Sequence, residues 1–234
     1  MYENLFDEKH RLVKASGLNV LSKRESQSGE NESDLLCRDC DNKKLGRLED
    51  YAKRVLYSGN LGESQKIEVC NQLHPDGKLT STYCKNINYV KFKLFLLSIL
   101  WRSSISRGDF FTEVCLRKKE EILRKMLYEE DPKSQLDFPC VILSFKFYQR
   151  KIASFVISSP RKIKSEKGTY YVFQIGQLVM MFFVSPEDVP NFVTDAAITP
   201  EGRMRIIHLD EENGKDLMNK IFGKEITAAL YLHT

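Results

Sequence analysis

The sequence lacks most of the motifs that identify an enzyme class. It has no glycine-rich phosphate loop, no dinucleotide-binding fingerprint, no Gly-x-Ser-x-Gly elbow and no His-Glu-x-x-His pair. Only four of its 234 residues are histidines, so few side chains have the ordinary pKa of a general base. Motifs alone therefore name neither a reaction nor a small-molecule cofactor.

A long hydrophobic run is also missing. The longest run, Leu94 to Trp101, is interrupted by Ser98 and has less than half of the roughly 20 residues that cross a bilayer. Three of the first ten residues, Glu3, Asp7 and Glu8, are acidic, whereas a secretory signal would have a basic start and then an apolar stretch. We therefore predict a cytoplasmic protein without membrane spans, whose six cysteines are mostly reduced.

Neither sign of charge dominates. The chain has 36 basic and 32 acidic residues, and its net charge of +4 is too small to indicate a polyanionic partner. Hydrophobic residues at 42% and charged residues at 29% are values typical of globular proteins. The length allows one large domain or two small ones, and we favour two linked units.

Changes in pattern along the chain define three predicted segments. Residues 1–34 form a polar, partly disordered segment, residues 35–131 a helical domain, and residues 132–234 an α+β sheet domain. Apolar spacings of three and four predict helices after Asp41 or Asn42 as far as residue 56, over 88–104, and over 115–129. Alternation then predicts strands over 141–147, 153–158, 169–175, 178–184 and 204–209, followed by a helix over 215–222. The expected class is α+β, with a helical N-terminal half and a C-terminal antiparallel sheet that ends in a helix.

The most specific motif is a pair of cysteines separated by two residues, Cys37 and Cys40. Two thiolates at this spacing can bind one ion from a tight turn, which is half of a structural zinc site. The turn leads directly into a predicted helix, as in treble-clef zinc folds, where the metal ties a loop to a helix start. The alternative is a pair of ordinary thiols that bind no metal.

A second pair of zinc ligands is harder to find. Cys70, His74 and Cys84 flank the predicted turn Pro75-Asp76-Gly77, but their spacing matches no standard zinc pattern. Isolated cysteines usually behave as small hydrophobic residues, so we expect these three residues to be packed or solvated. Cys115 and Cys140 stand beside apolar residues, which indicates packing.

Basic residues gather around the predicted turns of the sheet domain, close to aromatic residues in the sequence. The basic candidates are Arg150, Lys151, Arg161, Lys162, Lys164 and Lys167, and the aromatic neighbours are Tyr170, Tyr171 and Phe173. Such a combination could bind a phosphate backbone and stack on bases. Because acidic residues such as Glu166 dilute the charge, we prefer a lysine-rich hairpin that keeps the sheet edges soluble.

One stretch of the sequence reads Leu35-Leu36-Cys37-Arg38-Asp39-Cys40-Asp41-Asn42, continues through Gly46 to Glu49-Asp50-Tyr51, and is followed by Phe92 to Arg102. This stretch resembles a group of uncharacterised bacterial proteins with an HNH-endonuclease-like zinc knuckle. The resemblance covers roughly the first half of the chain. It implies that members of the group carry an earlier Cys-x-x-Cys and a Ser-His-Ile-x-Pro run that supplies the nuclease histidine. This chain has no cysteine before Cys37, and its only earlier histidine is His10.

Three hypotheses for function follow. The first is a non-catalytic or degenerate nuclease-derived protein, with structural zinc as its only cofactor, that binds a protein or nucleic acid in a setting such as phage defence or a mobile element. The second is an active metal-dependent HNH-type DNA endonuclease, with His74 as base and Asp76 or Glu49 assisting the ion. The third is a metal-free scaffold or interaction subunit.

Overall fold

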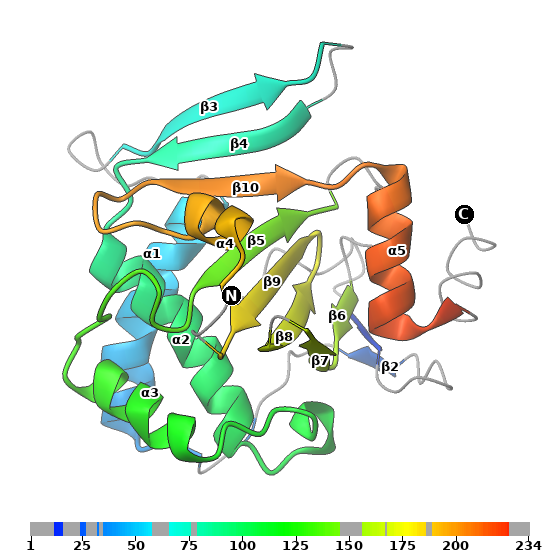
Figure 1. Cartoon of the computed structure of the whole chain (residues 1–234). Helices are drawn as coiled ribbons and strands as arrows, with labels where there is room; N and C mark the ends of the chain where they lie inside the picture. The colour runs from blue at the N-terminus through cyan, green and yellow to red at the C-terminus, as the bar shows by residue number, and fades with distance from the viewer. Residues whose placement is uncertain are drawn as a thin grey trace.

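Ten strands of the chain form one mixed sheet with helices on both of its faces (Figure 1). The computed structural model describes residues 12–15, 24–26, 32, 35–57, 66–75, 79–145, 156–166, 168–185 and 189–224. Along the sheet the strands follow the order β2-β1-β6-β8-β9-β5-β10-β4-β3, and β7 pairs with β8. The α+β class predicted from the sequence is confirmed.

Most neighbouring strands in the sheet run antiparallel, but β1 pairs with β6, and β5 with β10, in the parallel direction. Local alternation of side chains predicts a strand but not the direction of the strand beside it. The two parallel pairs therefore correct the prediction of an antiparallel sheet. The strands are β1 (Leu12–Ala15), β2 (Arg24–Ser26), β3 (Glu68–Leu73), β4 (Leu79–Lys85), β5 (Cys140–Ser144), β6 (Val156–Ser158), β7 (Arg161–Ser165), β8 (Gly168–Ile175), β9 (Leu178–Phe183) and β10 (Met204–His208).

The helices divide between two apolar clusters, one on each face of the sheet. The helices are α1 (Gly46–Leu56), α2 (Tyr89–Ile105), α3 (Lys118–Tyr128), α4 (Asn191–Ala196) and α5 (Glu211–Phe222). Helices α1, α2 and α3 pack in the cluster that contains Ile142 of β5, and α4 and α5 pack in the cluster that contains Val141. All five residues of β5 are buried, so the prediction of a half-buried strand is corrected: both of its faces are covered.

Helix α2 is the central helix of the larger cluster, as its sequence predicts. The side chain of Asn88 caps it by accepting a 2.9 Å hydrogen bond from the backbone N–H of Lys91. Residues 92–100 are buried on every side of the helix. Trp101 is partly buried and packs against the same cluster, in agreement with its interpretation as a core residue.

Residues from both sides of the predicted boundary at 131/132 share one sheet. Strands β3 and β4 come from the predicted helical unit, yet β4 pairs with β10 of the predicted sheet unit. The larger apolar cluster also takes residues from both units. The boundary therefore does not separate two cores, and β1 and β2 add parts of the 1–34 segment to the same sheet.

Candidate thiol and metal site

Cys37 and Cys40 lie in the first helical turn before α1. The backbone N–H of Asp41 donates a 3.0 Å hydrogen bond to the carbonyl of Cys37, and a π-helical stretch, Asp39–Leu45, leads without a break into α1. The expected turn is thus itself helical. The prediction that Asp41 or Asn42 caps α1 is wrong, because both residues lie inside this stretch and the residue before α1, Leu45, is helical and buried.

The two sulfur atoms interact directly. Cys37 accepts hydrogen bonds from the backbone N–H and from the thiol of Cys40, and both bonds hold the pKa of Cys37 below its ordinary value. The same bond to Cys37, together with partial burial, raises the pKa of Cys40. Cys37 is exposed and Cys40 is half-buried. The pair therefore presents one accessible sulfur with increased thiolate character, which is the form that binds metals and attacks electrophiles.

The helical turn is anchored to the end of α3. The ammonium of Lys44 donates a 3.2 Å hydrogen bond to the carbonyl of Tyr128 and lies 4.3 Å from the centroid of its ring. Arg47 forms a 3.2 Å ion pair with Glu130, the second residue after α3. These contacts join the helical stretch that follows the thiol pair to a segment far along the chain.

Cys70 and Cys84 lie on opposite faces of the β3–β4 hairpin. Cys70 is paired with Tyr83 and Cys84 with Val69, and paired residues share a face while successive residues alternate. Cys70 is exposed, whereas Cys84 is buried, and burial raises the pKa of its thiol. The two sulfurs cannot bind one ion together.

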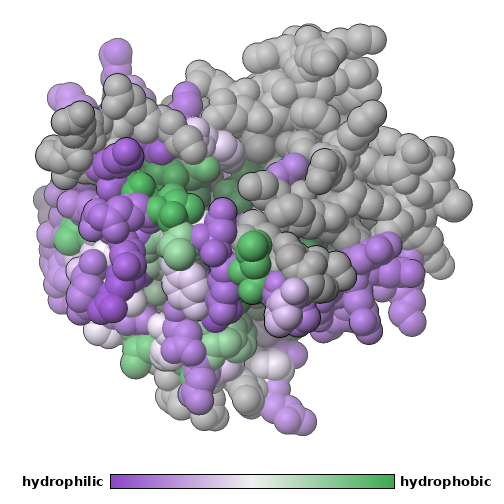
Figure 2. All heavy atoms as spheres, turned by 90° about the horizontal axis from the view of Figure 1, so that it is seen from above, coloured by the Kyte–Doolittle hydropathy of each residue, from purple (hydrophilic) through white to green (hydrophobic). Residues whose placement is uncertain are grey.

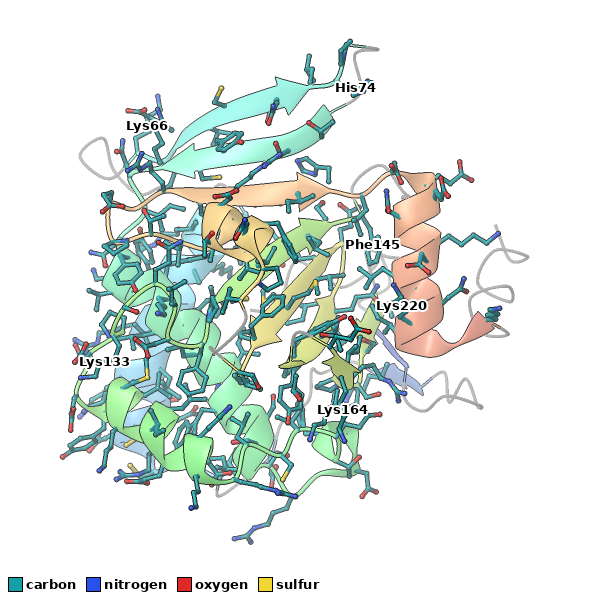
Figure 3. The ribbon with its side chains drawn as sticks, viewed as in Figure 1. Lys66, His74, Lys133, Phe145, Lys164 and Lys220 are labelled. Carbon is teal, nitrogen blue, oxygen red and sulfur yellow. The ribbon has the colours of Figure 1, made fainter. Side chains whose placement is uncertain are left out.

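The candidates for a nuclease site are not brought together. His74 follows β3 and is exposed at the tip of the hairpin (Figure 3), far from Glu49 in α1. The carboxylate of Glu49 instead accepts a 2.6 Å hydrogen bond from Arg102 of α2. Asp76 lies outside the described residues. Within the described parts of the chain, no three or more histidine, cysteine, aspartate or glutamate side chains form a group that could hold a metal ion.

The predicted basic cluster is partly neutralised. Arg161 forms an ion pair with Glu113, whose carboxylate also accepts a 2.8 Å hydrogen bond from the backbone N–H of Lys162. Lys162 and Lys164 are exposed on β7. Arg150, Lys151 and Lys167 lie outside the described residues. The cluster therefore keeps fewer uncompensated charges than the sequence indicated.

The aromatic residues near this cluster belong mainly to the core. Tyr171 and Phe173 are buried under the helices, and the hydroxyl of Tyr171 donates a 2.8 Å hydrogen bond to the carbonyl of Cys115. Tyr170 stacks on Phe183 with a centroid distance of 5.3 Å. The two buried rings are not positioned to stack on bases.

No protein-family model matches the chain, and neither a curated protein nor a solved structure matches it significantly. Within the part of the chain that the structure describes, each helix is too short or too polar to reach across a membrane.

Proposed function

We propose that this chain is a cytoplasmic zinc-binding interaction protein, descended from HNH-like nucleases, in which Cys37 and Cys40 hold the ion and the protein acts by binding a partner. The observation that carries the proposal is that both thiols, two residues apart, lie at the start of one helix. A bound zinc ion would supply structural cross-linking at this point rather than chemistry.

The thiol pair fits half of a zinc site. Zinc in structural sites takes four ligands, and the lowered pKa of Cys37 favours the thiolate that the metal requires. The described residues add no third ligand to the pair. The proposal therefore requires the remaining ligands to come from residues outside the described ranges or from another subunit.

A protein partner is favoured over nucleic acid. Glu113 compensates Arg161 in the basic cluster, and the aromatic rings Tyr171 and Phe173 are committed to the core. Nucleic-acid binding depends on uncompensated cations and often on accessible rings. A partner in phage defence or in a mobile element is an inference by analogy with the HNH-like proteins that the first half of the sequence resembles.

Zinc content is the decisive measurement. Protein expressed with added zinc and purified without chelator should contain zinc close to one ion per chain or per pair of chains, measured by elemental analysis. Cys37→Ser and Cys40→Ser should each lose the metal. Cys115→Ser is the matched control, because Cys115 is exposed, contrary to the packing that its sequence neighbours indicated, and only its backbone bonds to Tyr171. Wild-type protein without zinc would reject the metal part of the proposal.

The nuclease hypothesis needs a separate experiment. Supercoiled plasmid is incubated with the purified protein and Mg²⁺ or Mn²⁺, and nicking is followed by gel electrophoresis. We expect no nicking above the background of a heat-inactivated sample. Nicking that disappears in His74→Ala would replace the binding proposal with the nuclease.

Dithiol exchange is a second candidate function, which the asymmetry of the pair favours. The exposed Cys37 has the lowered pKa and Cys40 the raised one, as in a nucleophilic and a resolving thiol. The Cys37 thiolate would attack a partner disulfide and release one partner thiolate; Cys40 would then close the Cys37–Cys40 disulfide and release the second. Titration of metal-free protein in glutathione buffers, read by mass spectrometry, tests for this reversible disulfide.

A further inference from the structure

Strand β3 is the outer edge of the sheet and is exposed along its whole length. It bonds to β4 on one side, and all six of its residues, Glu68–Leu73, are exposed to solvent. In Figure 1 the β3–β4 hairpin extends beyond β10 at the upper edge of the molecule. An edge strand of this kind leaves a row of backbone donors and acceptors that another strand can pair with.

The usual protection of an edge strand is weak here. The segment Glu68–Leu73 contains no lysine and no proline, and its single charged residue, Glu68, accepts a 3.1 Å hydrogen bond from Asn86. The pairing of the hairpin shifts between Gln72 and Leu73, where the extra residue is Thr80 of β4, so β3 itself has no bulge. β3 therefore keeps the regular geometry that strand pairing requires.

Two large apolar side chains on this edge are solvent-exposed. Val69 is 61% exposed and Leu73 59% exposed, and because they are four residues apart they share one face of the strand. Figure 2 views the molecule from the side on which β3 lies and shows apolar side chains set among hydrophilic ones. Their exposure is explained if a neighbouring strand covers them.

We propose that β3 pairs with β3 of a second copy of the chain, antiparallel and related by a two-fold axis at Asn71. Residues that lie directly opposite each other in two paired strands point to the same face of the sheet. An axis between two residues would place each residue opposite its sequence neighbour, which points to the other face. The axis therefore has to pass through a residue. The candidates that overlap most of the strand are therefore Cys70 and Asn71.

The side-chain pattern selects Asn71. With the axis at Asn71, Val69 of each copy lies opposite Leu73 of the other, so the two exposed apolar residues pair twice. Glu68 then lies opposite His74, a carboxylate against an imidazole. With the axis at Cys70, Leu73 lies opposite Ile67, but Val69 faces the polar Asn71, and Lys66 faces His74, which opposes two basic side chains. Apolar and charge complementarity therefore both favour the first register and a second copy as the occupant.

Oligomeric state tests the proposal. Analytical ultracentrifugation of the full chain from micromolar to submillimolar concentration should show a dimer that persists in a metal chelator, which separates it from any zinc-linked association. Val69→Lys and Leu73→Lys each place two lysines opposite apolar residues in the dimer and should weaken it by about tenfold or more. Ile122→Lys, on the exposed face of α3, is the matched control and should leave it unchanged.

Cross-linking tests the register. In a Cys70→Ser background, Asn71→Cys places one thiol opposite its own copy, and mild oxidation should give a dimer joined by a disulfide at position 71, identified by peptide mass spectrometry. Circular dichroism confirms that each variant is folded. A chain that stays monomeric at every concentration overturns the proposal, as does a dimer that Val69→Lys and Leu73→Lys leave intact. A dimer in which the native Cys70 cross-links to itself, while the thiol introduced by Asn71→Cys does not, would overturn the Asn71 register.

Discussion

Arg102 donates a 2.6 Å hydrogen bond to the carboxylate of Glu49, joining the core helix α2 to the helix that follows the thiol pair. The ion pair is partly buried, with side-chain exposures of 25% and 29%. The bond gives Glu49 a structural role, because it links α1 to the core helix α2. It also shows how the position of α1, and with it the thiol pair, is fixed by a residue 53 positions later in the chain.

Glu49→Gln should therefore lower the free energy of unfolding without removing zinc. We expect a loss of about 1 kcal/mol, because the partner cation is left with a weaker, neutral acceptor at a partly buried site. Urea denaturation measures the loss, and elemental analysis checks the zinc. Glu121→Gln is the control, since its ion pair with Arg124 is solvent-exposed and screened, and its loss should change the stability less. A loss of zinc in Glu49→Gln with unchanged stability would show that Glu49 is a ligand.

The thiol pair should be recognisable by its reactivity in metal-free protein. Iodoacetamide should modify Cys37 faster at pH 7 than Cys70 and Cys115, which are also exposed, because the lowered pKa of Cys37 increases its thiolate fraction. Cys40→Ala removes one of the hydrogen bonds to Cys37 and should raise its pKa and slow the reaction. Rates per residue come from mass spectrometry of quenched samples. Equal rates for the three cysteines would contradict the assigned interaction.

The elements that could be predicted from sequence carry their signals locally. Helix α2 has its cap at Asn88 and a continuous apolar run, and strands β8 and β9 flank the short turn Gly176-Gln177. Each signal needs no knowledge of the rest of the fold. The spacing of Cys37 and Cys40 is also a local signal, and both residues lie at the start of one helix, but metal binding by them remains a prediction.

The hairpin β3–β4 could not be predicted from alternation, because β3 is exposed on both faces and therefore has no apolar period. The turn residues Pro75-Asp76-Gly77 were a usable hairpin signal. The partners of the site residues were beyond reach for a different reason: Arg102 pairs with Glu49, and Glu113 with Arg161, only through tertiary packing. No local pattern encodes such pairs.

Gly202 is required by a close backbone approach. Its φ is +73°, its carbonyl accepts a 3.1 Å hydrogen bond from the backbone N–H of Ile87, and a Cβ there would lie 2.3 Å from the Ile87 carbonyl oxygen. Gly202→Ala should cost about 3 kcal/mol or more, from the left-handed backbone and from displacement of the segment between β4 and α2. Thermal or urea unfolding measures it.

Gly46→Ala is the opposite case and serves as the control. Gly46 begins α1 with a helical φ of −56°, and the atom nearest to a Cβ would be 3.6 Å away. Alanine should therefore stabilise the protein by about 0.5–1 kcal/mol through its helix propensity. If both alanine variants had the same stability, the close approach at Gly202 would not be present in solution.

Lys93 gives the chain a pH dependence that can be isolated. Its side chain is buried on α2, where the ammonium donates hydrogen bonds to the carbonyl of Ser134 and, at 3.2 Å, to the hydroxyl of Tyr89. Burial lowers the pKa of Lys93 from 10.5 to about 8, even though Asp137 and Asp131 act to raise it. Below pH 8 the lysine is charged in both the folded and unfolded states, and the folded state carries the cost of the buried charge.

Between about pH 8 and 10.5 the unfolded chain binds the proton that the folded chain has released, so the stability contributed by this group rises with pH. The free energy of unfolding of wild type minus that of Lys93→Met should therefore increase across this window, by about 3 kcal/mol at most. Taking the difference cancels the titration of the other lysines, tyrosines and cysteines. Lys91 is exposed on the same helix, so the free energy of unfolding of wild type minus that of Lys91→Met should show no such increase. Urea denaturation from pH 7 to 10.5 measures the difference. A difference that stayed constant would mean that water reaches the Lys93 ammonium. The space between α2 and the segment after α3 would then be more open than the packing indicates.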